Sequence, residues 1–259
     1  MTRFRAFTAW AALAALAAST ALRAAPAIAA PAPAAASQAD RATAAAAAAA
    51  APAPREEDAG AQALFEQILR RVSTYKDFQA RFVETSESRA GTGPARESGQ
   101  VFFKRPDLWR WEYTDPERKV VRVRGQEAEI AIEGDPQVSR YDLGAGDGPS
   151  GIGALLSGGE ALSRAFNARF EKGVEPQAPV LRLDPVTLSD EYEYLLLRVR
   201  RADLAILEVV IVDPGGNRLR FQFEDLRPDR GLSDALFRFT GGASPEARPR
   251  APSADAGKP

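Results

Sequence analysis

The sequence contains no cysteine and no histidine among its 259 residues. Without cysteine the chain cannot form disulfides, thiolate metal sites or a cysteine nucleophile. Without histidine it also lacks imidazole metal ligands and the usual general base near neutral pH. An enzyme made from this chain would depend on carboxylates, hydroxyls, lysine or arginine alone. We therefore expect a protein that is not an enzyme and that uses no metal and no cofactor.

The sequence also lacks an excess of charge of either sign. Lys+Arg 34 against Asp+Glu 35 give a formal net charge of -1 at pH 7. No net basic field is available to attract a polyanion. Nucleic acid is therefore not among the expected partners.

The apolar run near the N-terminus is too short for a membrane span, which needs about 20 apolar residues. Arg3 and Arg5 precede the run from Ala6 to Ala18, and Ala27-Ile28-Ala29 offers a small-residue cleavage site. We interpret residues 1–29 as a Sec-type signal peptide rather than an uncleaved anchor helix. No cysteine follows to carry a lipid, so we expect a soluble periplasmic protein.

Two segments have little to bury. Residues 30–60 are dominated by alanine and proline, and residues 241–259 have a similar low complexity. Chains without large side chains cannot offset the entropy lost on ordering. We expect a disordered spacer at 30–60, one folded domain at 61–240 and a disordered tail at 241–259.

Aromatic residues are concentrated in one short stretch. Two of the three tryptophans, Trp109 and Trp111, alternate with polar residues and are followed at the same step by Tyr113. In a β-strand this spacing sends all three rings to one face. Such a row is either part of the core or a surface that binds a ligand, and the spacing alone favours the core.

Helical and strand patterns divide the folded region. Apolar residues at three- and four-residue steps predict a helix over Ala61–Tyr75. Strand alternation begins at Phe78 and continues through the aromatic stretch. The later segments with strand character are Lys119–Val123, Ala128–Ile132, Pro136–Leu143, Val180–Leu183, Tyr192–Arg200, Ala205–Asp213 and Arg218–Asp225.

A glycine-rich segment interrupts the strands at residues 144–159. It predicts a short apolar helix at Ile152–Leu156, and Glu160–Phe170 reads as a second helix or an irregular segment. Together the patterns predict a mainly β (α+β) domain, in which an open, strongly curved antiparallel sheet carries helices on its concave side. If the helices can lift, the apolar surface beneath them becomes a pocket.

Polar motifs suggest no chemistry by themselves. Acidic residues cluster at Asp184, Asp190, Glu191 and Glu193, but their spacing matches no calcium loop, and a solvated face is the favoured interpretation. Arg105, in the turn before the aromatic row, is by spacing alone a surface charge. Its five-donor guanidinium could also tie down a neighbouring loop.

The stretch from Ser98 to Pro116 has the pattern S-G-x-x-x-x-K-R-P-x-x-x-R-W-E-Y-x-x-P. In this pattern, in the helix leading into Phe78-Gln-Ala-Arg-Phe82, and in Phe237-x-Phe239, the chain resembles the periplasmic outer-membrane lipoprotein carriers of the LolA family. The resemblance implies an incomplete antiparallel β-barrel with a helical lid over a hydrophobic cavity. The spacer and the C-terminal tail lie outside it.

The resemblance also implies roles for individual residues. Arg105 would hydrogen-bond the lid backbone and hold the empty protein closed, and Arg105→Leu should then alter acyl-ligand affinity or lid mobility. The residues expected to line the cavity are Phe82, Phe103, Trp109, Trp111, Tyr113, Ile130 and Ile132. The residues expected in the lid are Ile152, Leu155 and Leu156. Relatives commonly carry an aromatic pair where this chain has Glu129 and Ile132, which places this part of the cavity wall in question.

The function implied is transport without catalysis. The protein would take acylated lipoproteins from an inner-membrane lipoprotein-releasing ABC transporter and pass them to an outer-membrane lipoprotein receptor, acting as a monomer. The alternative is a LolA-like sensor of lipid or lipoprotein that regulates an envelope-stress pathway. Such sensors usually carry a second domain, and about 180 folded residues leave little room for one.

Overall fold

The computed structural model describes residues 56–240 except 90, 92, 144–150, 173, 174 and 190. The predicted signal peptide, most of the predicted spacer and the predicted tail lie outside these residues. Within the described part of the chain, no helix combines the length and the apolar character needed to cross a membrane.

The described chain is built mostly from strands. Its helices are α3 (Glu56–Ser73), α4 (Gly151–Ser157), α5 (Glu160–Ala165) and the 3-10 helix η2 (Asp234–Phe237). The strands before α4 are β1 (Asp77–Glu87), β2 (Ala95–Lys104), β3 (Leu108–Asp115), β4 (Lys119–Arg124), β5 (Glu127–Ile132) and β6 (Val138–Asp142). The strands after α5 are β7 (Phe166–Phe170), β8 (Val180–Pro185), β9 (Tyr194–Arg200), β10 (Ala205–Val212) and β11 (Arg218–Pro228).

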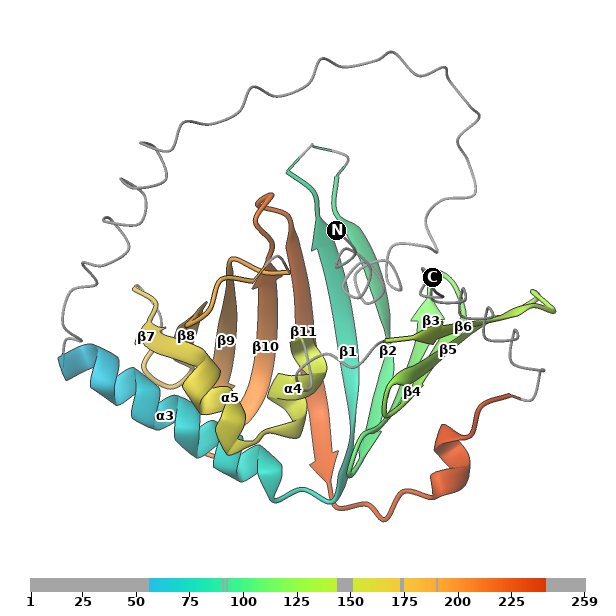
Figure 1. The fold of residues 1–259 in the computed structure, drawn as a ribbon, viewed down its shortest axis with the longest axis horizontal. Coiled ribbons are helices and arrows are strands. Elements are labelled where there is room, and N and C mark those ends of the chain that lie inside the picture. The colour runs from blue at the N-terminus through green and yellow to red at the C-terminus, as the bar shows by residue number, and fades with distance from the viewer. Residues whose placement is uncertain are drawn as a thin grey trace, which may run out of the picture.

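All of these strands form one 11-stranded sheet in the order β6-β5-β4-β3-β2-β1-β11-β10-β9-β8-β7, and every neighbouring pair is antiparallel. β1 pairs with β11, so the first and last strands meet in the middle of the sheet. β6 and β7 lie at opposite edges. Figure 1 shows the sheet curling, with α3, α4 and α5 gathered on one side of it. The predicted mainly β fold, an incomplete and strongly curved antiparallel barrel, is confirmed.

The long helix α3 begins at Glu56 rather than at the predicted Ala61, inside the range expected to be spacer. Asp58 places a negative charge near the N-terminus of the helix, where it interacts favourably with the helix dipole. The side of α3 that packs into the core carries Ala61, Leu64, Phe65, Ile68, Leu69 and Val72, all buried. Packing of this apolar side, more than helix propensity, holds such a helix in place.

The segment Glu160–Phe170 corrects the prediction of a second helix or irregular segment. Only its first half is helical, as α5, and the backbone becomes extended at Phe166 with φ -133 and ψ 141. Phe166 and Ala168 are then buried in alternation within β7, which pairs with β8. The four-residue step from Leu162 to Phe166 imitates a helix, whereas the alternation that follows belongs to an edge strand under α3.

Candidate functional site

The aromatic row of β3 lies on the side of the sheet that the helices cover. Trp109, Trp111 and Tyr113 are all buried, and their rings point to the same face. Strand pairing places Phe103 opposite Trp109 and Val121 opposite Trp111. The apolar face therefore continues from β2 across β3 to β4. We call this side of the sheet the concave face.

The structure brings together the residues predicted to line a cavity. Of these, Phe82, Phe103, Trp109, Trp111, Tyr113 and Ile130 are buried, and Ile132 is partly buried. The ring centroids of Phe103 and Trp109 are 4.4 Å apart, and Phe82 is 5.0 Å from both Trp111 and Tyr113. These are ordinary separations for packed aromatic pairs. Whether the rings also bind a ligand stays a prediction at this point.

Helix α4 packs against this concave face. Ile152, Leu155 and Leu156, the residues predicted for a lid, are each about as buried as the core strands. A Cβ atom placed on Gly153 would lie 3.8 Å from the indole of Trp109. Since glycine at this position carries no side chain, the helix backbone comes close to the ring. The predicted lid segment and the predicted cavity residue are thus in contact.

The end of α4 is fitted tightly to α3 at Gly158. The Gly158 N–H donates to the carbonyl of Ala154 at 3.0 Å, and the residue has φ +72. This left-handed conformation ends the helix and favours glycine. A Cβ at Gly158 would lie 2.6 Å from the carbonyl oxygen of Leu69 and 3.0 Å from the backbone nitrogen of Ser73. Glycine is therefore required both by backbone conformation and by the closeness of α3.

Arg105 joins these two helices through their backbone carbonyls. Its Nε donates to the carbonyl of Tyr75 at 2.7 Å, and its Nη2 donates to the carbonyls of Val72 at 3.2 Å and Ser157 at 2.5 Å. Val72 and Ser157 lie in the last turns of α3 and α4, where carbonyls have no partner within the helix. Partial burial lowers the pKa of Arg105, but an arginine remains charged in proteins. The side chain thus connects the turn after β2 to the ends of both helices.

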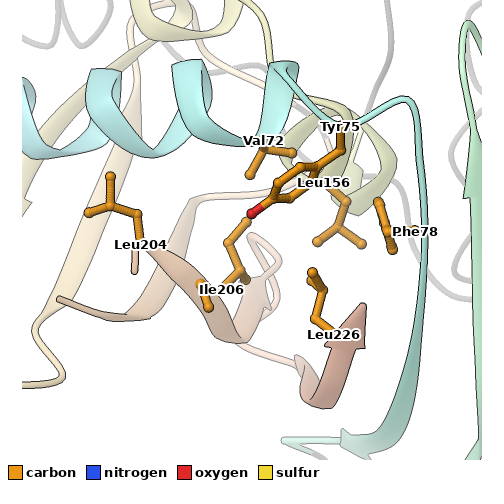
Figure 2. Close-up of a pocket in the computed structure, with 8 residues that line it drawn as sticks. Val72, Tyr75, Phe78, Leu156, Leu204, Ile206 and Leu226 are labelled. Atoms are coloured by element: carbon orange, nitrogen blue, oxygen red, sulfur yellow. The ribbon is translucent and has the colours of Figure 1, made fainter. Parts of the chain in front are cut away.

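Leu156 fills most of the space between α3 and the strands beyond it. Figure 2 shows its side chain between Tyr75, Phe78 and Leu226. The space left among these side chains and their neighbours Val72, Leu204, Ala205 and Ile206 is about 10 Å³. That volume is at the limit for a single water molecule. An acyl chain could enter this region only if α4 moved.

A row of polar side chains interrupts the concave face at one end. It comprises Glu84 of β1, Glu97 of β2, Tyr113 of β3 and Lys119 of β4, and we call it the polar row. The Tyr113 hydroxyl donates to Oε2 of Glu84 at 2.7 Å. The Lys119 ammonium donates to Oε1 of Glu97 at 2.7 Å and lies 4.2 Å from the centroid of the Tyr113 ring. Glu84 and Lys119 are each 2% exposed.

Burial alters the acid–base properties of this row. Desolvation raises the pKa of Glu84 from 4.5 to about 7, and the Glu97 carboxylate adds to the rise, while the hydrogen bond from Tyr113 and the charge of Lys119 oppose it. Desolvation also raises the pKa of Tyr113 well above its ordinary value, and the neighbouring Glu84 contributes. The hydroxyl of Tyr113 therefore stays a donor, and Glu84 titrates near neutral pH.

The opposite, convex face of β3–β6 carries a charged cluster around Glu129. Glu129 is fully buried; its Oε1 accepts from Arg122 at 3.1 Å and from the backbone N–H of Thr240 at 2.8 Å. Its Oε2 accepts from Arg140 at 3.3 Å. Glu129, at a position where relatives commonly carry an aromatic residue, therefore lies on the face opposite the concave side. On the concave side the adjacent residue Ile130 continues the apolar face.

The C-terminal segment, residues 229–240, runs from a loop held by Asp77 to the Glu129 cluster on the convex face. It starts at a loop in which the Asp77 carboxylate accepts the backbone N–H groups of Arg230, Gly231 and Leu232 at 2.7 to 3.1 Å. Further along, Arg110 donates to the carbonyl of Leu236 at 3.0 Å. Side-chain hydrogen bonds, rather than strand pairing, thus fix the end of the domain.

Within the acidic cluster noted in the sequence, Asp184 forms two ion pairs. Asp184 accepts from Arg182 at 2.9 Å and from Arg169 at 3.2 Å. Asp190 lies outside the described residues. Across the described residues, no group of three or more His, Cys, Asp or Glu side chains is arranged to hold a metal ion.

Sequence reasoning missed the polar row apart from Tyr113, which was grouped with the apolar residues. A signal was present for Glu84, because it follows Phe78, Ala80 and Phe82 at strict two-residue steps and so shares their buried face. The partners of Glu84 gave no comparable signal. They come from three other strands, and their proximity depends on the strand registers.

Comparison with known proteins relates this arrangement to a family. Residues 73–240 match the family model described as outer membrane lipoprotein carrier protein LolA. A protein of Nitrosomonas europaea named outer-membrane lipoprotein carrier protein is 27% identical over 166 residues, covering 63% of this chain and 78% of the relative. One of the same name from Chromobacterium violaceum is 29% identical over 187 residues, covering 72% of this chain and 85% of the relative.

One solved structure is similar to this chain at low identity. A LolA superfamily protein from Nitrosomonas europaea matches with a TM-score of 0.39 and 14% identity. The match covers 69% of this chain and 97% of that one.

Proposed function

Because this chain belongs to the LolA family of outer membrane lipoprotein carrier proteins, we propose that it binds the acyl chains of lipoproteins released from the inner membrane and delivers them to the outer membrane. The proposal includes a periplasmic location, which rests on the N-terminal signal-type sequence. It also includes a releasing ABC transporter and an outer-membrane receptor as partners. The protein would work as a monomer and without catalysis.

The observation that carries the proposal is the set of hydrogen bonds from Arg105 to α3 and α4 above an aromatic face. α4 covers the concave face mainly through three apolar side chains and this one guanidinium. If these hydrogen bonds break, α4 can lift from Trp109 and expose the apolar surface. A single polar side chain then controls access to the binding face.

The energetics suit a carrier. Burial of hydrocarbon contributes about 0.8 kcal/mol per CH₂, so acyl chains do not enter water unaided. A face that was always open would bind them too tightly to release them. When α4 must open before an acyl chain binds, the net affinity is the affinity of the open form multiplied by the fraction of molecules that are open. The strength of the Arg105 hydrogen bonds thus sets the affinity.

The direct test is a release assay. Proteoliposomes containing an acylated lipoprotein and its releasing transporter are incubated with the purified protein and ATP, and the soluble fraction is analysed for a one-to-one complex. We expect such a complex with the natural sequence and loss of it with Trp109→Ala, which removes part of the aromatic face. Leu188→Ala is the control, since it truncates an apolar side chain that is 98% exposed.

Two outcomes separate this proposal from its alternatives. If the protein binds a fluorescent acyl probe but releases no lipoprotein, transport is refuted, and the sensor of lipid or lipoprotein becomes the better interpretation. If it binds no acyl probe under any condition, the concave face is only a core. In that case the only effect of Trp109→Ala would be a loss of stability.

A further inference from the structure

The charges of the polar row do not balance once Glu84 is ionised. Glu84 and Glu97 supply two carboxylates, whereas Lys119 supplies one ammonium, which donates a hydrogen bond to Glu97. Among the described residues, Glu84 receives a hydrogen bond only from the neutral hydroxyl of Tyr113 and forms no ion pair. A buried carboxylate without a cation is costly. Groups of this kind are concentrated at functional sites.

The row also ends an apolar surface. On β1 the concave-facing residues Phe78, Ala80 and Phe82 precede Glu84, and on β4 Val121 and Val123 lie beyond Lys119. At about 3.3 Å per residue, Glu84 lies roughly 20 Å along the strand from Phe78. The concave face therefore matches the shape of an amphiphile, because a long apolar surface ends at a group of polar side chains.

We propose that the polar row binds the ammonium group of an acylated amphiphile, with Glu84 as its counter-ion. The inference rests on the proposed function, because the acyl chains must lie on the aromatic face for the head to reach Glu84. Lys119 does not oppose the ligand strongly, since its charge is paired with Glu97 at 2.7 Å. The ammonium would supply the positive charge that the row lacks and would donate hydrogen bonds to the Glu84 carboxylate.

The proposal predicts selection between two kinds of acylated head. A free primary amine supplies the missing cation, whereas an amide made by acylating that amine supplies none. Binding an amide-linked ligand would leave Glu84 without a counter-ion, which the low-polarity surroundings penalise. The same ammonium chemistry occurs at the free amino terminus of a diacylated lipoprotein and in an amine phospholipid. The experiment below distinguishes them.

The test compares two probes that differ only in the amine. One is a cysteinyl peptide with an S-linked dipalmitoylglyceryl group and a free α-amine, and the other is its N-acetyl form. Both are offered from phosphatidylcholine vesicles. The acyl chains of both probes are brominated, so binding is followed by the quenching of tryptophan emission. At pH 8 we expect about tenfold tighter binding of the amine probe, which corresponds to about 1.4 kcal/mol.

Glu84→Gln tests the assigned residue, since it preserves shape and removes charge. We expect this variant to bind both probes with the affinity that the natural protein has for the N-acetyl probe. A second measurement needs no variant. Binding of the amine probe at pH 7 should favour ionised Glu84 and so release protons to the solvent. Calorimetry in two buffers of different ionisation enthalpy measures this release. Equal binding of both probes by the natural protein, or an undiminished preference in Glu84→Gln, overturns the proposal.

The same experiment gives different results if the ammonium site is wrong and if the proposed function is wrong. Equal binding of both probes would refute the ammonium site and leave acyl binding intact, whereas binding of neither would refute the proposed function as well. Vesicles of phosphatidylethanolamine and phosphatidylglycerol identify the source of the amine. Preference for phosphatidylethanolamine assigns the site to a membrane lipid, and preference for the peptide amine alone assigns it to a lipoprotein terminus.

Discussion

Arg105 and Ser157, separated by 52 positions in the sequence, are joined by a 2.5 Å hydrogen bond from the guanidinium Nη2 to the backbone carbonyl. The same nitrogen also donates to α3. One side chain in the turn after β2 therefore contacts both α3 and α4 at their C-terminal ends. These polar contacts add to the apolar packing of Ile152, Leu155 and Leu156 on the concave face.

Replacement of Arg105 should loosen α4 without unfolding the sheet. Arg105→Lys keeps the charge but cannot reach three carbonyls with fork geometry, and Arg105→Leu removes every donor. At about 1 kcal/mol per hydrogen bond, we expect amides of α4 to exchange with solvent about tenfold faster or more. Hydrogen exchange measures this effect, and Arg118→Leu is the control because the Arg118–Glu133 pair is exposed. Unchanged exchange in Arg105→Leu would contradict the assigned role.

Two glycines of the α4 segment should respond oppositely to alanine. Gly158→Ala forces a Cβ to within 2.6 Å of the Leu69 carbonyl and requires an alanine in the left-handed conformation. We therefore expect the free energy of unfolding to fall by about 1 kcal/mol or more. Gly153→Ala makes an ordinary 3.8 Å contact with Trp109 and should stabilise by up to about 1 kcal/mol. Urea denaturation measures both. A similar result for the two variants would show that α4 is not packed as described.

Glu84 should make the stability of the protein depend on pH. Its pKa is 4.5 unfolded and about 7 folded, so below pH 4.5 it is protonated in both states and contributes nothing. As pH rises to about 7, the unfolded state ionises first, and the folded state is destabilised by up to about 3 kcal/mol. Glu84→Gln should therefore be more stable than the natural protein at pH 8 and nearly equal at pH 4. Urea denaturation at both pH values measures the difference, and equal differences at both would disprove the assignment.

Loss of Glu129 should release the C-terminal segment from the convex face. Glu129→Ala leaves Arg122 buried without its partner, and breaking a buried pair in this way costs about 3–5 kcal/mol. The variant should also be cut faster by protease near Thr240, which loses two hydrogen bonds to the same carboxylate. Glu133→Ala, at an exposed ion pair, should change stability by less than about 0.5 kcal/mol. If both variants unfold at the same urea concentration, the Glu129 cluster does not anchor the segment.

The limits of the sequence interpretation are visible at three positions. Helix α3 starts at Glu56 rather than Ala61 because helix boundaries depend on local charge and fraying as well as on apolar spacing. Phe166 was grouped with helical positions, since two apolar residues four apart also fit a helix; its pairing with Pro185 decided for a strand. The departure at Glu129 put the cavity wall in question, but the strand sends Glu129 to the face opposite Ile130.

The sequence by itself determined the aromatic face and the mainly β fold. Two-residue periodicity is a local property, so Trp109, Trp111 and Tyr113 had to share one side of any strand they formed. Only the tertiary structure decided which carbonyls Arg105 reaches, which segment covers Glu129 and that the partner of Glu84 is a neutral hydroxyl. These are contacts between residues far apart in the chain, and they depend on strand registers and helix positions that no local pattern specifies. The physical reason is that periodicity orients a side chain, whereas its partners are chosen by the packing of the whole domain.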